Sequence, residues 1–119
     1  MGETESAVSA FLTEFKLIVT EGSGLYVVNR TENRDSLVTL GITEAIRRRE
    51  ILSLSVADYC AGPEEDRDRP GEVWIFGKTI NDAHVYIKLK IAGTAGVRFA
   101  KCISFHVAEY PLRFPLREK

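Results

Sequence analysis

The sequence predicts an α+β domain in which amino-terminal helices pack on one face of a small antiparallel sheet. Two observations support this prediction. Apolar residues recur at helical spacing in the first half of the chain and at strand spacing in the second half. The two patterns meet at residues 62–71, a charged stretch with two prolines and two glycines. Helices followed by consecutive strands are typical of α+β folds rather than of alternating α/β folds.

The length of 119 residues suits one domain, and 45% apolar with 28% charged residues is an ordinary globular composition. We therefore expect a single domain over residues 1–119. Its expected parts are a helical part over about residues 4–60, a charged loop at 62–71, antiparallel strands over 72–106 and an extended tail at 107–119.

Three helices are expected before the charged loop. In the first, six apolar residues share one helical face: Val8, Phe11, Leu12, Phe15, Ile18 and Val19. Thr31 can cap a second, short helix that ends at Gly41, and Thr43 begins a third. Residues 25–28 form either a brief strand or a connector, and residues 55–58 match a capping box.

Three strands are expected after the loop, at Glu72 to Ile80, His84 to Ile91 and Val97 to His106. Asn81 and Asp82 suit a tight hairpin turn between the first two strands, and residues 93–96 suit a second turn. Pro111 and Pro115 indicate that the last residues form an extended tail.

Because side chains alternate across a strand, the faces of the sheet can be assigned. One face of the middle strand is apolar and should contact the helices: Val85, Ile87, Leu89 and Ile91. Its other face carries His84, Tyr86, Lys88 and Lys90. In the last strand, Phe99, Lys101, Ile103 and Phe105 alternate with Ala100, Cys102, Ser104 and His106. If Ile103 and Phe105 belong to the core, Ser104 and His106 join the polar face, which helices on one side leave solvated.

This polar face carries the groups needed to cleave RNA without a metal, namely a base, an acid and fixed cations. An imidazole titrates near neutral pH, so His106 suits either proton role. Tyr86 could position the phosphate, stack on a base or act as the acid, and Lys88 and Lys90 would stabilise negative charge. The alternative is that these are ordinary residues of a solvated strand face.

The net charge of −1 hides a split along the chain. Residues 1–77 carry 8 basic and 14 acidic side chains, a net of −6, whereas residues 78–119 carry 8 and 3, a net of +5. This asymmetry predicts a basic surface on the strands, with the acidic helices and loop behind it. No apolar run approaches the ~20 residues of a membrane span, and the amino terminus lacks signal-peptide features. With only two cysteines, a cytoplasmic protein without a disulfide scaffold is expected.

Four residues could in principle bind zinc: Cys60, His84, Cys102 and His106. They form no Cys-x-x-Cys pair, and Cys102 and His106 would lie ~13 Å apart on an extended strand. We therefore expect no metal site and no cofactor.

Several segments resemble a known family. Val85-Tyr-Ile-Lys-Leu-Lys-Ile91, followed by Cys102-Ile-Ser-Phe-His106, resembles the carboxy-terminal core of the MqsR family, the motility quorum-sensing regulator toxins of bacterial toxin–antitoxin systems. Leu52-Ser-Leu-Ser-Val-Ala-Asp-Tyr59 is similar to the family segment ahead of the strands, and residues 51–77 resemble a subgroup of the family. The likeness covers about the last seventy residues, with a looser fit to the first helix.

The resemblance implies a RelE-like fold and a sequence-specific messenger-RNA endonuclease that needs no ribosome. Its partner would be a cognate zinc-binding, helix-turn-helix antitoxin encoded beside it. By position, the family's strand tyrosine falls on Tyr86 and its late lysine falls on His106. The chain departs from the family pattern at two further positions. The family's lysine after the Asp-Phe-Tyr segment would fall near Ala61, and its glutamine before the first strand would fall near Val73.

The leading hypothesis is therefore a cytoplasmic, metal-independent mRNA endoribonuclease toxin that cleaves through attack by the 2′-hydroxyl. The expected catalytic residues are His106, Tyr86 and Lys88, and the expected RNA-binding residues are Lys78, Lys90, Ser104 and His84. Lys78 shares its strand face with Trp74 and Phe76, so it could instead bury its stem and expose only its tip. The competing hypothesis is a non-catalytic RNA- or protein-binding module on the same fold.

Overall fold

The computed structural model describes residues 3–94 and 96–117 and confirms the α+β class. Its helices are α1 (Glu3–Glu21), α2 (Thr31–Leu40) and α3 (Glu44–Leu52), with a short 3-10 turn, η1 (Val56–Asp58). Its strands are β1 (Leu25–Val27), β2 (Tyr59–Glu65), β3 (Glu72–Ile80), β4 (Ala83–Thr94) and β5 (Val97–Val107).

None of the helices in the described part of the chain is long and apolar enough to cross a membrane.

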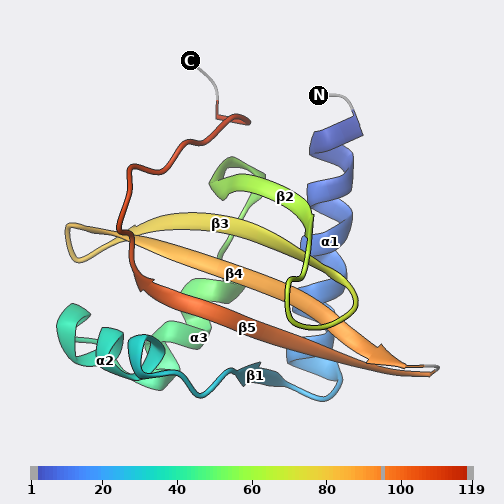
Figure 1. Ribbon diagram of the computed structural model, residues 1–119, viewed down its shortest axis with the longest axis horizontal. Coiled ribbons are helices and arrows are strands. Elements are labelled where there is room, and N and C mark those ends of the chain that lie inside the picture. Colours follow the sequence, from blue (N-terminus) through green and yellow to red (C-terminus); the bar gives the residue numbers. More distant parts are fainter. Residues whose placement is uncertain (1–2, 95, 118–119) are drawn as a thin grey trace.

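The five strands form one sheet in the order β1-β5-β4-β3-β2 (Figure 1). The pairs β2–β3, β3–β4 and β4–β5 are antiparallel. The edge strand β1 runs parallel to β5, with Leu25 opposite Ala100. The sheet is therefore mixed rather than purely antiparallel as predicted. The run over residues 25–28, which the sequence left open between strand and connector, contains this short edge strand.

The helices cover one face of the sheet, and the core lies between the two layers (Figure 1). Five of the six predicted apolar residues of α1 are buried, and Ile18 is partly buried. On β4, Val85, Ile87 and Leu89 have no exposed surface, as their predicted helix-facing position requires. The ring of Phe11 stacks on that of Trp74 with centroids 4.9 Å apart, which joins α1 to β3.

Local signals in the sequence set most element ends. The Thr43 hydroxyl accepts a hydrogen bond from the Ile46 N–H at the start of α3, and Gly41 ends α2 with φ of 71°. Asn81 and Asp82 both have positive φ, 49° and 67°, as a two-residue type I′ hairpin turn requires. The predicted cap at Thr31 is wrong by one residue, since Arg30 occupies the N-cap of α2. The second predicted turn includes residue 95, which lies outside the described residues.

The sequence did not predict β2. Residues 59–65 form an edge strand against β3, so the helical part ends at Asp58 and the connecting loop spans residues 66–71 rather than 62–71. The register of β2 shifts on both sides of Ala61, and Gly62 and Pro63 lie in this irregular part. Glycine and proline read as loop signals, but an edge strand tolerates both at an irregularity.

A β-bulge at Ile103 changes the faces of β5. Lys88 pairs with Ser104 and Leu89 with Cys102, so Ile103 is the extra residue and the alternation reverses there. The assumption that Ile103 and Phe105 belong to the core is therefore right for Phe105, which is fully buried, and wrong for Ile103. Phe99, which strict alternation places on the same face as Phe105, is exposed. Strict alternation also misplaced the residues before the bulge, because Ala100 and Cys102 are fully buried.

Candidate functional site

Tyr86 on β4 and His106 on β5 lie directly opposite each other in the sheet. Their rings stack, with centroids 5.4 Å apart and planes inclined by 26°. Lys88 and Ser104 form the next cross-strand pair. All four side chains line a depression of about 420 Å³ on the face of the sheet away from the helices, named here the first depression. The structure thus brings together the three predicted catalytic residues and Ser104.

The orientation of His106 leaves one ring nitrogen available for proton transfer. Its Nδ1 lies 3.0 Å from the carbonyl oxygen of Val107. A carbonyl oxygen can only accept, so Nδ1 carries the hydrogen in this contact. In the neutral ring, Nε2 then has a free lone pair, which is the form a general base needs.

Tyr86 suits the opposite role. Its side chain is half-buried, and this burial raises the pKa of the phenol above its ordinary value, with the Glu64 carboxylate adding to the shift. Tyr86 therefore keeps its proton throughout the neutral range, so it can donate a hydrogen bond or a proton to an oxygen.

The bulge that precedes Ser104 and His106, which line the first depression, is held by a buried residue of α2. The Asn33 amide nitrogen donates to the carbonyl oxygens of Ile103 and Val28, each at 2.9 Å, and its side-chain oxygen accepts from the Phe105 N–H at 2.9 Å. Asn33 is 1% exposed. It supplies hydrogen bonds to backbone groups on both sides of Ser104 and so fixes the backbone that carries the site.

One wall of the first depression was not predicted. Five consecutive tail residues line it: Ala108, Glu109, Tyr110, Pro111 and Leu112. In Figure 1 the tail leaves the end of β5 and runs past β3 toward β2. The prolines indicated an extended tail, but no local pattern indicates where such a tail packs.

A second depression, of about 380 Å³, adjoins the first and shares Tyr86 and Lys88 with it. Its other lining residues come from β2 and the 66–71 loop, together with Arg30, Val73 and Ile103. Four of them are carboxylates: Glu64, Glu65, Asp66 and Asp68. The expectation that the acidic loop lies behind a basic face is therefore wrong, because the loop lies on the same face, beside Lys88.

Lys90 does not belong to the site, contrary to the prediction. It is 3% exposed, and its ammonium group lies 2.6 Å from the Asp66 carboxylate and 2.8 Å from the Pro70 carbonyl oxygen. The ion pair lowers the pKa of Asp66 to about 2. Lys90 thus anchors the 66–71 loop to the sheet, and its charge is not available to a phosphate.

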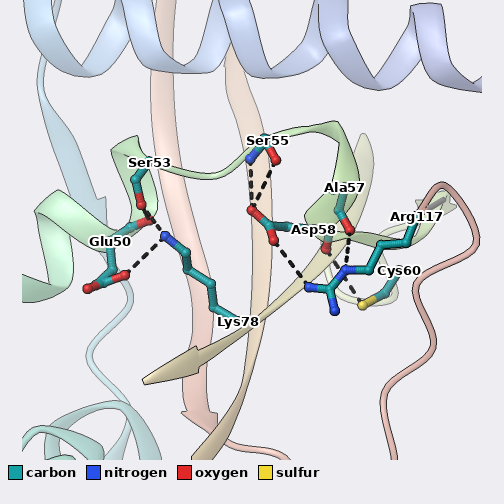
Figure 2. Close-up of polar contacts among 8 residues, drawn as sticks. All are labelled: Glu50, Ser53, Ser55, Ala57, Asp58, Cys60, Lys78 and Arg117. Carbon is teal, nitrogen blue, oxygen red and sulfur yellow. Dashed lines mark hydrogen bonds and ion pairs between the residues drawn. The ribbon is translucent and has the colours of Figure 1, made fainter. Parts of the chain in front are cut away.

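Lys78 and His84 are also not brought to the depressions. Lys78 points to the helix side, where its ammonium lies 3.1 Å from the Glu50 carboxylate and donates to the Ser53 hydroxyl (Figure 2). His84 is exposed near the start of β4 and lines neither depression. Of the predicted RNA-binding residues, only Ser104 therefore joins the catalytic candidates.

One of the two departures from the family pattern lies at the second depression. Val73, where the resemblance places a glutamine, is 4% exposed and lines this depression with an apolar side chain. Ala61 is half-buried on β2 and lines neither depression. Within residues 3–94 and 96–117, no three His, Cys, Asp or Glu side chains come together as a metal site would need.

Comparison with known proteins adds no relative. No protein-family model matches the chain, and neither a curated protein nor a solved structure matches it at a significant level. The likeness to the MqsR toxins therefore stays a prediction from the sequence, and the functional argument depends on the geometry around Tyr86 and His106.

Proposed function

We propose that this protein is a metal-independent endoribonuclease that cleaves messenger RNA through attack by the 2′-hydroxyl group. The observation that carries the proposal is the stacked Tyr86–His106 pair, with Lys88 beside it in the first depression. These residues supply a base, an acid and a fixed cation within one surface hollow.

The reaction follows from the state of each group. His106 Nε2 takes the proton of the 2′-hydroxyl, and the oxygen attacks the adjacent phosphorus. The bond from phosphorus to the 5′-oxygen breaks, and the leaving oxygen takes its proton from the Tyr86 phenol. The Lys88 ammonium stabilises the charge on the phosphoryl oxygens. The products are a 2′,3′-cyclic phosphate and a 5′-hydroxyl, and proton exchange with water restores both side chains.

The arrangement of the two depressions supports an RNA substrate. Because Tyr86 and Lys88 line both, a phosphate held at these residues has a hollow on either side. An endonuclease needs such space, since the chain continues in both directions from the bond that breaks. The sequence resemblance adds that the substrate is messenger RNA and that a neighbouring antitoxin, a zinc-binding helix-turn-helix protein, inhibits the enzyme.

A non-catalytic RNA- or protein-binding module is the competing proposal. The observation that favours it is the acidic rim of the second depression, because carboxylates beside Lys88 offset the positive charge that holds a phosphate. Binding by such a module would not depend on proton transfer by His106.

Incubation of the purified protein with RNA separates the two proposals. We expect His106→Ala to slow cleavage about 10²- to 10⁴-fold and Tyr86→Phe to slow it by a similar factor, as loss of a general base or acid does. His84→Ala is the matched control, because His84 is also a histidine of the sheet, on β4, but lines neither depression. This variant should cleave RNA like the wild type. If the wild type binds RNA without cleaving it, the endonuclease proposal fails and the binding module stands.

Expression in bacteria tests the toxin part of the proposal. Induced wild-type protein should arrest growth, the gene product encoded beside it should relieve the arrest, and His106→Ala should not arrest growth. Normal growth under strong expression of the folded wild type would contradict a toxin.

A further inference from the structure

The carboxy-terminal tail places an exposed aromatic ring at the first depression. Tyr110 is 79% exposed and lines this depression together with Tyr86 and His106. No hydrogen bond or ring contact with the described residues engages its side chain. A large aromatic surface is thus open to solvent beside the groups proposed to cleave RNA.

The tail that carries Tyr110 is seated on the sheet. Leu112 and Phe114 lie over Gly77 of β3, where a Cβ atom at residue 77 would come within 2.5 Å of Leu112 Cδ1 and 3.1 Å of the Phe114 ring. The missing side chain at Gly77 therefore makes room for the tail. Leu116 packs against the hydrophobic core.

Arg117 fastens the end of the tail. Its Nε donates to the Ala57 carbonyl oxygen at 3.0 Å, and its Nη2 lies 3.5 Å from the Asp58 carboxylate (Figure 2). Its guanidinium group also covers the Phe114 ring at 3.7 Å from the centroid. The backbone at Tyr110 thus lies between two held points, the end of β5 and the contacts of residues 112–117, which keep the ring beside the first depression.

We propose that Tyr110 is a stacking platform for an unpaired nucleobase of the RNA, next to the phosphate held by Lys88 and His106. This inference rests on the proposed function. Sequence-selective RNA-binding proteins commonly stack unpaired bases on exposed aromatic rings, because every base presents a π face. Because the tail backbone is already seated on the sheet, a base that stacks on Tyr110 orders only this side chain and not the tail, which favours binding. The ligand class is therefore single-stranded RNA rather than a duplex.

The test is binding of a short single-stranded 2′-O-methyl oligonucleotide, which cannot be cleaved through its 2′-oxygen, measured by fluorescence anisotropy. We expect Tyr110→Ala to weaken binding about 5- to 100-fold, the range for loss of one base-stacking contact. Tyr110→Phe and Tyr110→Trp should bind within about two-fold of the wild type or more tightly, because both retain a ring. Val38→Ala, which removes an 84% exposed apolar side chain on α2, is the control and should leave binding unchanged.

A second ligand separates stacking from other roles of Tyr110. An oligomer of the same length with abasic sugars should bind the wild type and Tyr110→Ala equally, since it has no base to stack. Equal binding of the 2′-O-methyl oligonucleotide by Tyr110→Ala and wild type would overturn the inference, and so would a Tyr110→Phe variant as weak as Tyr110→Ala. If Tyr110→Ala binds the oligonucleotide as well as the wild type does, the exposed Tyr110 ring would instead be assigned to a protein-binding surface on the tail.

The inference and the proposed function can fail separately. If the wild type cleaves RNA and Tyr110→Ala cleaves it with the same KM and kcat, the platform is wrong and the endonuclease stands. If the wild type binds the oligonucleotide through Tyr110 but cleaves no RNA, the endonuclease is wrong and the platform stands. Unchanged thermal midpoints of the Tyr110 variants would show that these differences do not come from unfolding.

Discussion

The side-chain oxygen of Asn33 accepts a hydrogen bond from the backbone N–H of Phe105 at 2.9 Å, across 72 positions of sequence. The amide nitrogen of the same side chain donates to Ile103, on the other side of Ser104. One buried residue of α2 thus holds the bulge in β5 that turns Ser104 and His106 toward the open face. The candidate site therefore depends on α2, although among the described residues of this helix and its N-cap only Arg30 lines either depression.

We predict that Asn33→Leu lowers both stability and activity. Leucine fills a similar volume but removes the Asn33 partners of the Ile103 carbonyl and the Phe105 N–H, at a cost of about 1–3 kcal/mol for each group left unsatisfied. The Val28 carbonyl also loses Asn33 but still accepts from the Arg30 N–H at 2.9 Å. Urea unfolding should show a loss of about 3 kcal/mol, and the folded fraction should cleave RNA more slowly because His106 is displaced. Thr39→Ala, at an exposed position of the same helix, should change stability by less than about 0.5 kcal/mol. A fully stable, fully active Asn33→Leu protein would contradict the positioning role.

We predict that Lys90 and Asp66 are coupled in stability. Removing either partner leaves the other without its ion pair at 2.6 Å, and Lys90 is nearly completely buried. Lys90→Met should therefore lower the free energy of unfolding by about 1–3 kcal/mol, with the order of magnitude taken from buried charge-assisted hydrogen bonds. The double variant with Asp66→Asn should be less destabilised than the sum of the single variants. Additive effects would show that the pair does not anchor the loop.

The same pair predicts a stability change in acid. Lys90 lowers the pKa of Asp66 from its ordinary 3.8 to about 2, so the unfolded chain binds this proton more readily than the folded one. The stabilisation is therefore fully present above about pH 4 and is lost as the pH falls toward 2. Urea unfolding midpoints of the wild type and Lys90→Met, compared between pH 5 and pH 2, measure this stabilisation. The difference between the two midpoints should shrink as the pH falls. A difference that stays constant over this range would contradict the assignment.

We predict that RNA binding weakens with salt, but only moderately. Lys88 and few other cations line the two depressions, and carboxylates of the second depression lie beside them. For a single-stranded ligand, each phosphate contact makes the slope of log K against log salt concentration more negative by about 0.7. Lys88→Met should make this slope less negative by about the same amount. Lys78→Met is the matched control and should leave it unchanged, because Lys78 is paired with Glu50 on the helix side. An affinity that does not change with salt would rule out phosphate contacts.

The sequence predicted those features that depend on neighbouring residues. Helical spacing located α1, a run of strand-forming residues located β3, and alternation located the buried face of β4. Thr43, Gly41 and the Asn81–Asp82 turn marked element ends through the backbone conformations they favour. Tyr86 and His106 were correctly placed on the same face of the sheet, because they are directly paired on adjacent strands where the register is regular.

The features that the sequence did not predict depend on contacts between distant residues. The bulge at Ile103 is stabilised by Asn33, and alternation within β5 carries no sign of it. The position of the acidic loop depends on the Lys90–Asp66 pair, and the tail wall depends on the space over Gly77. Such contacts are set by the three-dimensional packing and leave no local pattern.

The most direct test of the proposed chemistry compares two versions of one RNA oligonucleotide, one natural and one carrying 2′-O-methyl groups throughout. With the purified wild-type protein in the presence of a chelator, we predict that the natural RNA is cut to products with 2′,3′-cyclic phosphate and 5′-hydroxyl ends. The methylated RNA should remain intact although it binds, because its 2′-oxygen has no proton for His106 to remove. Cleavage of the methylated RNA, or no cleavage of natural RNAs of varied sequence, would contradict the proposed mechanism.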